Sequence, residues 1–187
     1  MEYFLGFFVN DQSRKQITDT VSNTSPIFSD MGIEVRWIKP SHYHMKIQNI
    51  PGSMNFLKKL YISKRIKGVF NKSIQISIGN LRLGSARNLK GLIYIEIGEG
   101  GDALRELRYE MLKTLKIKDN VQFVPHIAVG RINKELSNQE FSNIVKDIRN
   151  VNRNVQRDMV AFEVRELDLI RIKEGSYEIL KKFRTAL

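Results

Sequence analysis

Two segments in the middle of the chain alternate strictly between apolar positions and their neighbours. Isoleucine occupies every second position from 74 to 78 and again from 93 to 97. This period of two is typical of β-strands that bury one face. The apolar run Tyr3–Val9 predicts an opening strand, and residues 159–172 predict a long strand that accommodates a bulge.

Helical spacing marks other parts of the chain. Apolar residues recur every three or four positions over 104–115, and over 141–148 after a capping box formed by Ser137 and Glu140. We also predict helices near 12–23 and 53–70, and a short closing helix over 176–184. No glycine-rich phosphate loop follows a strand, which disfavours a nucleotide-binding α/β sheet. The order of elements favours an α+β fold of two packed halves, forming one domain over residues 1–187.

The charge is large and unevenly distributed. The 187 residues include 31 lysines and arginines against 20 acidic residues, so the net charge is +11. No acidic residue lies between Glu34 and Glu96, although basic residues are frequent there. A stretch of one sign attracts phosphate-bearing ligands. We therefore expect a positive surface on the first half, facing a polyanion.

Composition also excludes several kinds of site. The chain has no cysteine, which excludes disulfides, cysteine-based zinc or iron-sulfur sites and a thiol nucleophile, and favours the cytoplasm. No apolar run approaches the roughly 20 residues needed to span a bilayer. The apolar N-terminal run lacks the basic start of a signal peptide. We predict no membrane partner.

The first two of the three histidines lie close together. In the segment 40–47, strand alternation places His42, His44 and Lys46 on one face and three apolar side chains on the other. The apolar face is expected to join the core. The two imidazoles and the ammonium are then left together on the accessible face.

The third histidine has a similar context. Over 123–131, alternation places His126, Ala128 and Gly130 on one face, while the residues between them are buried. Each segment reads as a histidine followed by apolar, small or polar, and apolar residues. This similarity indicates an internal repeat with one histidine in each half.

The two segments resemble the motifs of the two-histidine (2H) phosphoesterases, in the branch of the 2'-5' RNA ligases and RNA 2',3'-cyclic phosphodiesterases. The resemblance rests on Pro40-x-x-x-His44-x-Lys46-Ile47 and on Pro125-His126-Ile-Ala128-Val-Gly-Arg131. It extends over nearly the whole chain through the lead-in 36–40 and the tail 167–177. It implies a bilobal α+β fold, whose two lobes are related by a pseudo-twofold axis and line a central cleft with antiparallel sheets.

This sequence departs from the family pattern two positions after each histidine. The family has a hydroxyl residue there, which donates a hydrogen bond to phosphate, whereas this chain has Lys46 and Ala128. Lys46 can bind phosphate as a point charge, but the Ala128 side chain can donate nothing. Arg131 matches a basic residue that often follows the second motif, and can partly replace the lost donor.

The resemblance implies a cyclic phosphodiesterase, with possible 2'-5' RNA ligase activity, in which His44 and His126 serve as general acid and base. No metal or cofactor is implied, and the expected partner is an RNA or nucleotide with a 2',3'-cyclic phosphate bound by a monomer. Histidine suits both roles because its pKa of about 6.5 lies near working pH.

Three alternatives stay open. His42, His44 and His126 can together form a three-histidine zinc site. The chain can be a binding module for RNA ends or nucleotides that keeps the cleft without turnover, because both hydroxyls are missing. It can also be a structural domain without a ligand.

Overall fold

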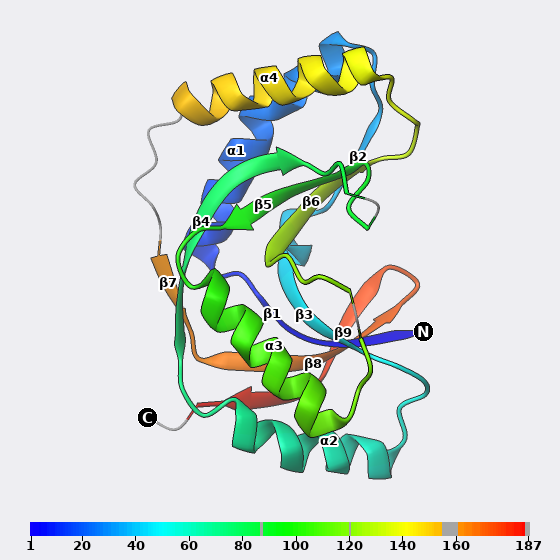
Figure 1. Ribbon diagram of the computed structural model, residues 1–187, viewed down its shortest axis with the longest axis vertical. Coiled ribbons are helices and arrows are strands. Elements are labelled where there is room, and N and C mark those ends of the chain that lie inside the picture. Colours follow the sequence, from blue (N-terminus) through cyan, green and yellow to red (C-terminus); the bar gives the residue numbers. More distant parts are fainter. Residues whose placement is uncertain (87, 120, 155–160, 186–187) are drawn as a thin grey trace.

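A computed structural model describes residues 1–86, 88–119, 121–154 and 161–185 (Figure 1). In this part of the chain the strands are β1 (Glu2–Phe8), β2 (Val35–Trp37), β3 (His44–Ile50), β4 (Ile74–Leu83), β5 (Leu92–Ile97), β6 (His126–Ile132), β7 (Ala161–Val164), β8 (Glu166–Lys173) and β9 (Ser176–Arg184). The helices are α1 (Asp11–Asp30), α2 (Phe56–Val69), α3 (Gly101–Leu115) and α4 (Asn138–Asn154), with a 3-10 turn, η1 (Pro40–His42).

The strands form one antiparallel sheet in the order β7-β4-β5-β6-β3-β1-β8-β9, and β2 also pairs with β6. The two motif strands, β3 and β6, are neighbours at its centre. Three strands extend the sheet on either side of them. Along the chain, β1-α1-β3-α2 is repeated as β5-α3-β6-α4, and the strand order places these two repeats symmetrically about the centre.

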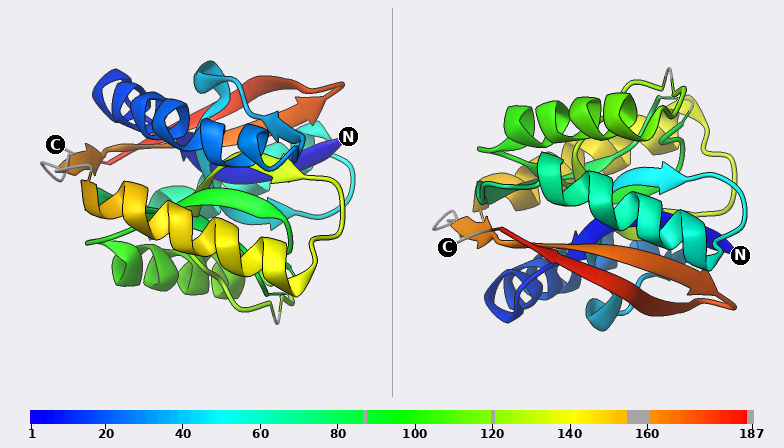
Figure 2. Two further views of the ribbon diagram at one scale, coloured as in Figure 1. Left: turned by 90° about the horizontal axis from the view of Figure 1, so that it is seen from above. Right: turned by 90° about the horizontal axis from the view of Figure 1, so that it is seen from below.

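Helices from the two halves pack against each other in pairs. Helix α1 packs with α4, and α2 packs with α3. Figure 1 shows the first pair at one end of the molecule and the second pair at the other, and the two end-on views in Figure 2 agree. Each pair therefore combines one helix from each repeat. The expected α+β fold, with two halves related by a pseudo-twofold axis, is confirmed, and the antiparallel strands of the two halves join in one continuous sheet.

The apolar alternation predicted the core well. Ile76, Ile78, Ile93 and Ile95 are at most 2% exposed, and burying each such side chain contributes roughly 1.5–3 kcal/mol. The capping box is also present: the Ser137 side chain accepts from the backbone N–H of Glu140 at 3.2 Å, and the Glu140 carboxylate accepts from that of Ser137 at 2.8 Å.

The predicted closing helix over 176–184 is wrong, because this segment is strand β9. It pairs with β8 through a turn in which Glu174 and Gly175 have positive φ. The pairing slips by one residue at Leu180, and such a bulge changes which face the following side chains occupy. Tyr177, Leu180 and Phe183 consequently recur every three residues and imitate a helix.

The long strand predicted over 159–172 is in fact two strands. β7 pairs with β4 in one half and β8 pairs with β1 in the other, so the segment crosses between the halves at Arg165. Residues 159 and 160 lie outside the described part. The helix predicted near 12–23 is longer than expected and reaches Asp30.

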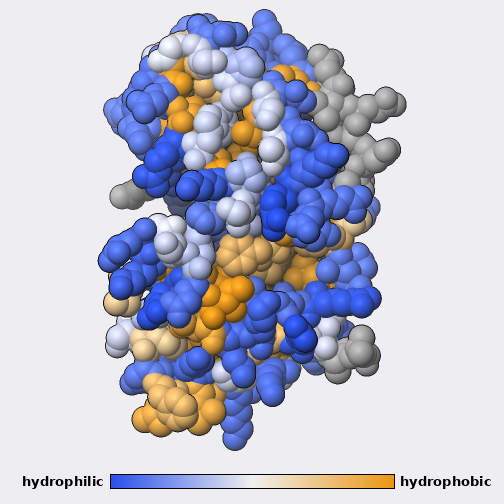
Figure 3. Space-filling view, turned by 180° about the vertical axis from the view of Figure 1, so that it is seen from behind, coloured by the Kyte–Doolittle hydropathy of each residue, from blue (hydrophilic) through white to orange (hydrophobic). Residues whose placement is uncertain are grey.

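The outer face of α2 is unusually apolar. Phe56, Leu57 and Leu60 are 77%, 73% and 58% exposed, and Figure 3 shows an apolar patch at the end of the molecule where α2 lies. Within the described ranges, no helix is long and apolar enough to cross a membrane.

Candidate active site

The two motif strands present the same pattern of side chains. Position by position, the seven residues of β3 have the same degree of burial as the seven residues of β6. The strands pair antiparallel with Met45 opposite Ile127, both fully buried. Because neighbouring residues of a strand point to opposite faces, His44 and Lys46 share the other face with His126 and Ala128.

This face forms one wall of a cleft of about 630 Å³. All five residues predicted for the site line it, two from β3 and three from β6: His44, Lys46, His126, Ala128 and Arg131. The cleft also receives side chains from β1, β2, β9 and α3. The topology thus brings together residues that lie more than 80 positions apart in the sequence.

Each cleft histidine is held by the same hydrogen bond. The Nδ1 atom of His44 lies 2.7 Å from the carbonyl oxygen of His42, and that of His126 lies 2.6 Å from the carbonyl oxygen of Val124. A carbonyl oxygen only accepts, so Nδ1 carries the proton in both rings. The Nε2 atom of each neutral imidazole is then left with a lone pair, which is the arrangement that a general base needs.

Burial makes the charged form of both histidines unfavourable. Aromatic rings surround His44, with the centroids of Phe4 and Tyr177 at 5.1 and 4.9 Å. Desolvation lowers the pKa of His44 to about 4, against the opposing effect of its carbonyl partner, and the charge of Lys46 lowers it further. Desolvation, and then Lys46, also lower the pKa of His126. The lowered pKa values favour the neutral form of both imidazoles at pH 7.

Lys46 has two partners that the sequence did not reveal. Its Nζ atom lies 2.5 Å from a carboxylate oxygen of Glu2 and 5.1 Å from the centroid of Phe4. Glu2 and Phe4 both belong to β1, the strand beside β3. Residues of β1 therefore hold the ammonium group in position. Its positive charge lowers the pKa of both histidines and is partly balanced by the carboxylate of Glu2.

A bulge carries Arg131 into the cleft. Strict alternation predicts Gly130 on the face of His126, but Gly130 is buried because β6 contains one extra residue, Val129, opposite β5. Arg131 then continues the cleft face. A matching bulge lies in β3, where Ile47 is the extra residue opposite β1. The bulges occupy the same place in the two repeats.

The side chain of His42 does not line the cleft with the other two histidines. His42 ends the turn η1, and its ring contacts Tyr177 at 4.9 Å. Strand alternation failed here because β3 begins only at His44. Within residues 1–86, 88–119, 121–154 and 161–185, no group of three His, Cys, Asp or Glu side chains is placed to hold a metal ion. The three-histidine zinc site is therefore not formed.

Sequence reasoning missed two parts of the cleft. Tyr177 was hidden by the incorrect helix over 176–184. Arg108 of α3 lines the cleft through bonds to Asp119 at 2.6 Å and to the Gln48 side chain at 3.0 Å, and it stacks on Phe123. Its position three residues before Met111 on an amphipathic helix gave no sign of this role.

The expected positive surface on the first half faces the cleft only in part. Of the described cations between Glu34 and Glu96, Arg36 and Lys46 line the cleft. Five others lie on α2, at the end of the molecule. The other described cations of the cleft, Arg108 and Arg131, come from the second half.

By sequence, the chain matches no family model and no curated protein. Comparison of structures gives a different result. The apo structure of E. coli LigT aligns with 100% of this chain and 98% of its own, at a TM-score of 0.68 and 14% identity. A structure described as a phosphoesterase aligns with 100% of this chain and 98% of its own, at a TM-score of 0.70 and 12% identity. The structure of Kluyveromyces marxianus Usb1 aligns with 96% of this chain and 96% of its own, at a TM-score of 0.57 and 13% identity.

The fold is that of the 2H phosphoesterases. The full coverage of both chains shows that the likeness extends to both halves, including the two central strands. At 12–14% identity it establishes the fold alone, so the chemistry has to be argued from the cleft residues.

Proposed function

We propose that this protein is an RNA 2',3'-cyclic phosphodiesterase in which His44 and His126 act as general base and general acid. The observation that carries this proposal is the matched pair of Nδ1 hydrogen bonds, which leaves a basic Nε2 atom on each of two imidazoles that line one cleft from adjacent strands. Two imidazoles on neighbouring strands can divide proton removal and proton delivery within one step. Neither role requires a metal ion.

In the proposed step, a water oxygen attacks the phosphorus and gives a proton to the Nε2 atom of the neutral imidazole. The bond between phosphorus and O3' breaks, its electron pair stays on O3', and the protonated imidazole delivers a proton there. The products are a 2'-phosphate and a free 3'-hydroxyl. When a 5'-hydroxyl takes the place of water, the same step joins two RNA ends through a 2'-5' bond and each histidine keeps its role. The histidines exchange roles when that bond is cleaved again to the cyclic phosphate.

The electrostatics of the cleft suit an anionic substrate. The lowered pKa of both histidines favours their neutral forms, so one of them must gain a proton before it can act as the acid. A bound phosphate favours the protonated imidazole, because opposite charges attract strongly in a partly buried site. Lys46 provides a donor for the phosphate oxygens, at the position where the family has a hydroxyl.

The structural neighbours support a phosphate-bearing ligand. Structures of E. coli LigT are described as complexes with 3'-AMP, ATP, NADP+ and phosphate. These ligands share phosphate groups, and three of them contain adenosine. We infer the same ligand class for this chain from its cleft, which contains two imidazoles and four cations among the described residues.

Hydrolysis of an oligoribonucleotide with a terminal 2',3'-cyclic phosphate tests the proposal, with phosphorus NMR to distinguish a 2'- from a 3'-phosphate. The wild type should form the 2'-phosphate and should do so equally in EDTA. His44→Gln and His126→Gln should each abolish turnover. His42→Gln is the matched control, since His42 lies outside the cleft lining, and it should remain active. Turnover that survives loss of both cleft histidines contradicts the proposal.

A second candidate is a binding module derived from such an enzyme. It is favoured by one observation, Ala128, which leaves the second motif without a side-chain donor for phosphate. This candidate predicts that the wild type binds the cyclic-phosphate RNA without turnover, with an affinity that falls steeply with salt. Ala128→Thr combined with Lys46→Thr should then restore hydrolysis.

A further inference from the structure

Two arginines face each other at one end of the cleft. Arg36 of β2 lies directly opposite Arg131 of β6 in the antiparallel pairing, and both line the cleft that contains the histidines. Arginine remains charged at any working pH. Like charges at directly opposite positions of a sheet are destabilising, so this pair is electrostatically unfavourable without an anion.

The partners of the neighbouring cations differ from those of this pair. Lys46 has Glu2, and Arg108 has Asp119. Among the described residues, Arg36 makes no hydrogen bond or ion pair, and the guanidinium of Arg131 has one bond, at 3.4 Å to the neutral backbone oxygen of Lys90. The positive charge of the pair is therefore not neutralised by a carboxylate within the described part of the chain.

The fold holds this pair in place through specific packing. The ring of Trp37 covers Gly130, where a Cβ atom would come within 2.8 Å of it, and Trp37 packs on Phe28 with the ring centroids 5.7 Å apart. The backbone N–H of Ile38 donates to the carbonyl of Val129 at 2.8 Å. The bulge at Val129 then turns Arg131 to the cleft face. The juxtaposition of the arginines thus depends on a fixed register.

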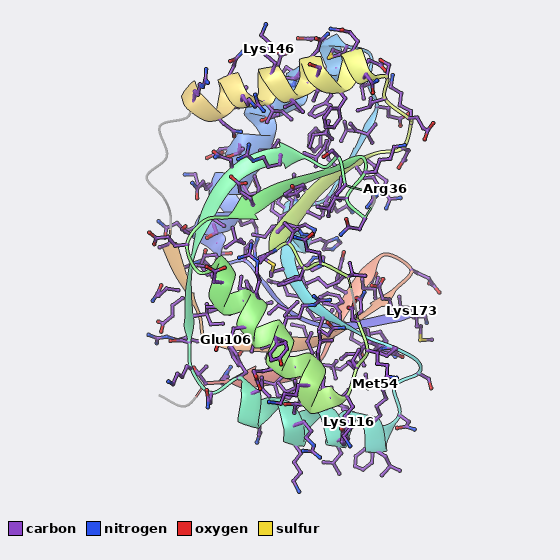
Figure 4. The ribbon with its side chains drawn as sticks, in the orientation of Figure 1. Arg36, Met54, Glu106, Lys116, Lys146 and Lys173 are labelled. Carbon is purple, nitrogen blue, oxygen red and sulfur yellow. The ribbon has the colours of Figure 1, made fainter. Side chains whose placement is uncertain are left out.

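The pair lies beyond the phosphate position proposed above. Ala128 lies opposite Tyr94 of β5 and Arg131 opposite Leu92, so the two residues are about 7 Å apart along the strand direction despite the bulge at Val129. Figure 4 shows Arg36 at the upper edge of the opening, with Lys173 of the β8-β9 hairpin at the lower edge. An anion held between the arginines is thus displaced from the histidines toward the mouth of the cleft.

We propose that Arg36 and Arg131 form a second anion subsite, which binds a phosphate other than the one attacked. This inference rests on the proposed function and narrows its substrate class: the preferred substrate carries a second phosphate beside its cyclic phosphate, as an oligonucleotide end or a 5'-phosphorylated nucleotide does. Two guanidinium groups can bind one phosphate through paired N–H donors.

The test compares adenosine 2',3'-cyclic phosphate with the same compound carrying a 5'-phosphate. In the wild type the second phosphate should raise kcat/KM by roughly 10- to 100-fold, the range expected for hydrogen bonds to charged groups. Arg36→Gln should bring the ratio between the two substrates close to one. Lys173→Gln removes one charge from the opposite edge, outside the cleft lining, and should leave the ratio unchanged.

A binding measurement separates this inference from the proposed catalysis. Adenosine 2',5'-bisphosphate should bind the wild type roughly 10- to 100-fold more tightly than adenosine 2'-phosphate in calorimetry, and Arg36→Gln should remove this difference. If the difference is present but neither cyclic compound is hydrolysed, the subsite stands and the catalytic proposal fails. If both compounds are hydrolysed at one rate, or Arg36→Gln slows both equally, the subsite is refuted.

Discussion

His44 should make the protein less stable as the pH falls below neutral. Its pKa is lowered to about 4 in the folded state by burial among aromatic rings, whereas the unfolded value is about 6.5. The unfolded chain therefore binds more protons between these two values. By linkage, the contribution of neutral His44 to stability is complete above pH 6.5 and is lost as the pH falls toward 4.

The magnitude follows from the two pKa values. Acidification from about pH 7.5 to about pH 5 protonates this histidine in the unfolded state but not in the folded state. The free energy of unfolding therefore falls by about 2 kcal/mol. Asp168 opposes this effect: it is buried on β8, its Oδ1 has no hydrogen-bond partner among the described residues, and desolvation raises its pKa to about 6. Between the same two pH values, Asp168 binds a proton in the folded state but hardly in the unfolded state. The free energy of unfolding therefore rises by about 1.4 kcal/mol from this residue.

Urea unfolding at the two pH values, followed through the single tryptophan Trp37, measures both contributions. His44→Gln should remove the part of the acid-induced loss that His44 contributes, so on acidification the free energy of unfolding of the variant should fall by about 2 kcal/mol less than that of the wild type. Asp168→Asn should shift the change in the opposite direction by about 1.4 kcal/mol. Identical pH dependence in the wild type and His44→Gln would refute the assigned desolvation of the histidine.

Three further predictions concern activity and packing. Because the pKa of both cleft histidines is lowered, kcat/KM should be greatest below pH 6.5 and should fall as the pH rises through this value, as a pH-rate profile can show. Lys46→Ala should lower kcat about a hundredfold or more, and Ala128→Thr should raise kcat or tighten binding, both in steady-state assays. Gly130→Ala should lower the free energy of unfolding by roughly 1–3 kcal/mol, because the new methyl group would press on Trp37. An unchanged urea midpoint would contradict the last of these.

Much of the fold was predictable because it depends on local patterns. The isoleucines of β4 and β5, the amphipathic helix α3 and the capping box of α4 each express a periodicity or a spacing within a few residues. The predictions failed where a bulge shifts the alternation of faces, at Leu180 in β9 and at Val129 in β6. A bulge depends on the partner strand, which the local sequence does not contain.

The sequence alone determined the two central strands and their histidines, because alternation decides which side chains leave the core, and this pattern is the same in both repeats. Only the tertiary structure decided what surrounds them. The approach of Glu2 to Lys46, of Tyr177 to His44 and of Arg36 to Arg131 each joins strands that are distant in the chain. Such contacts depend on sheet order and register. The desolvation that lowers the pKa of the histidines likewise exists only once both halves have closed around the cleft.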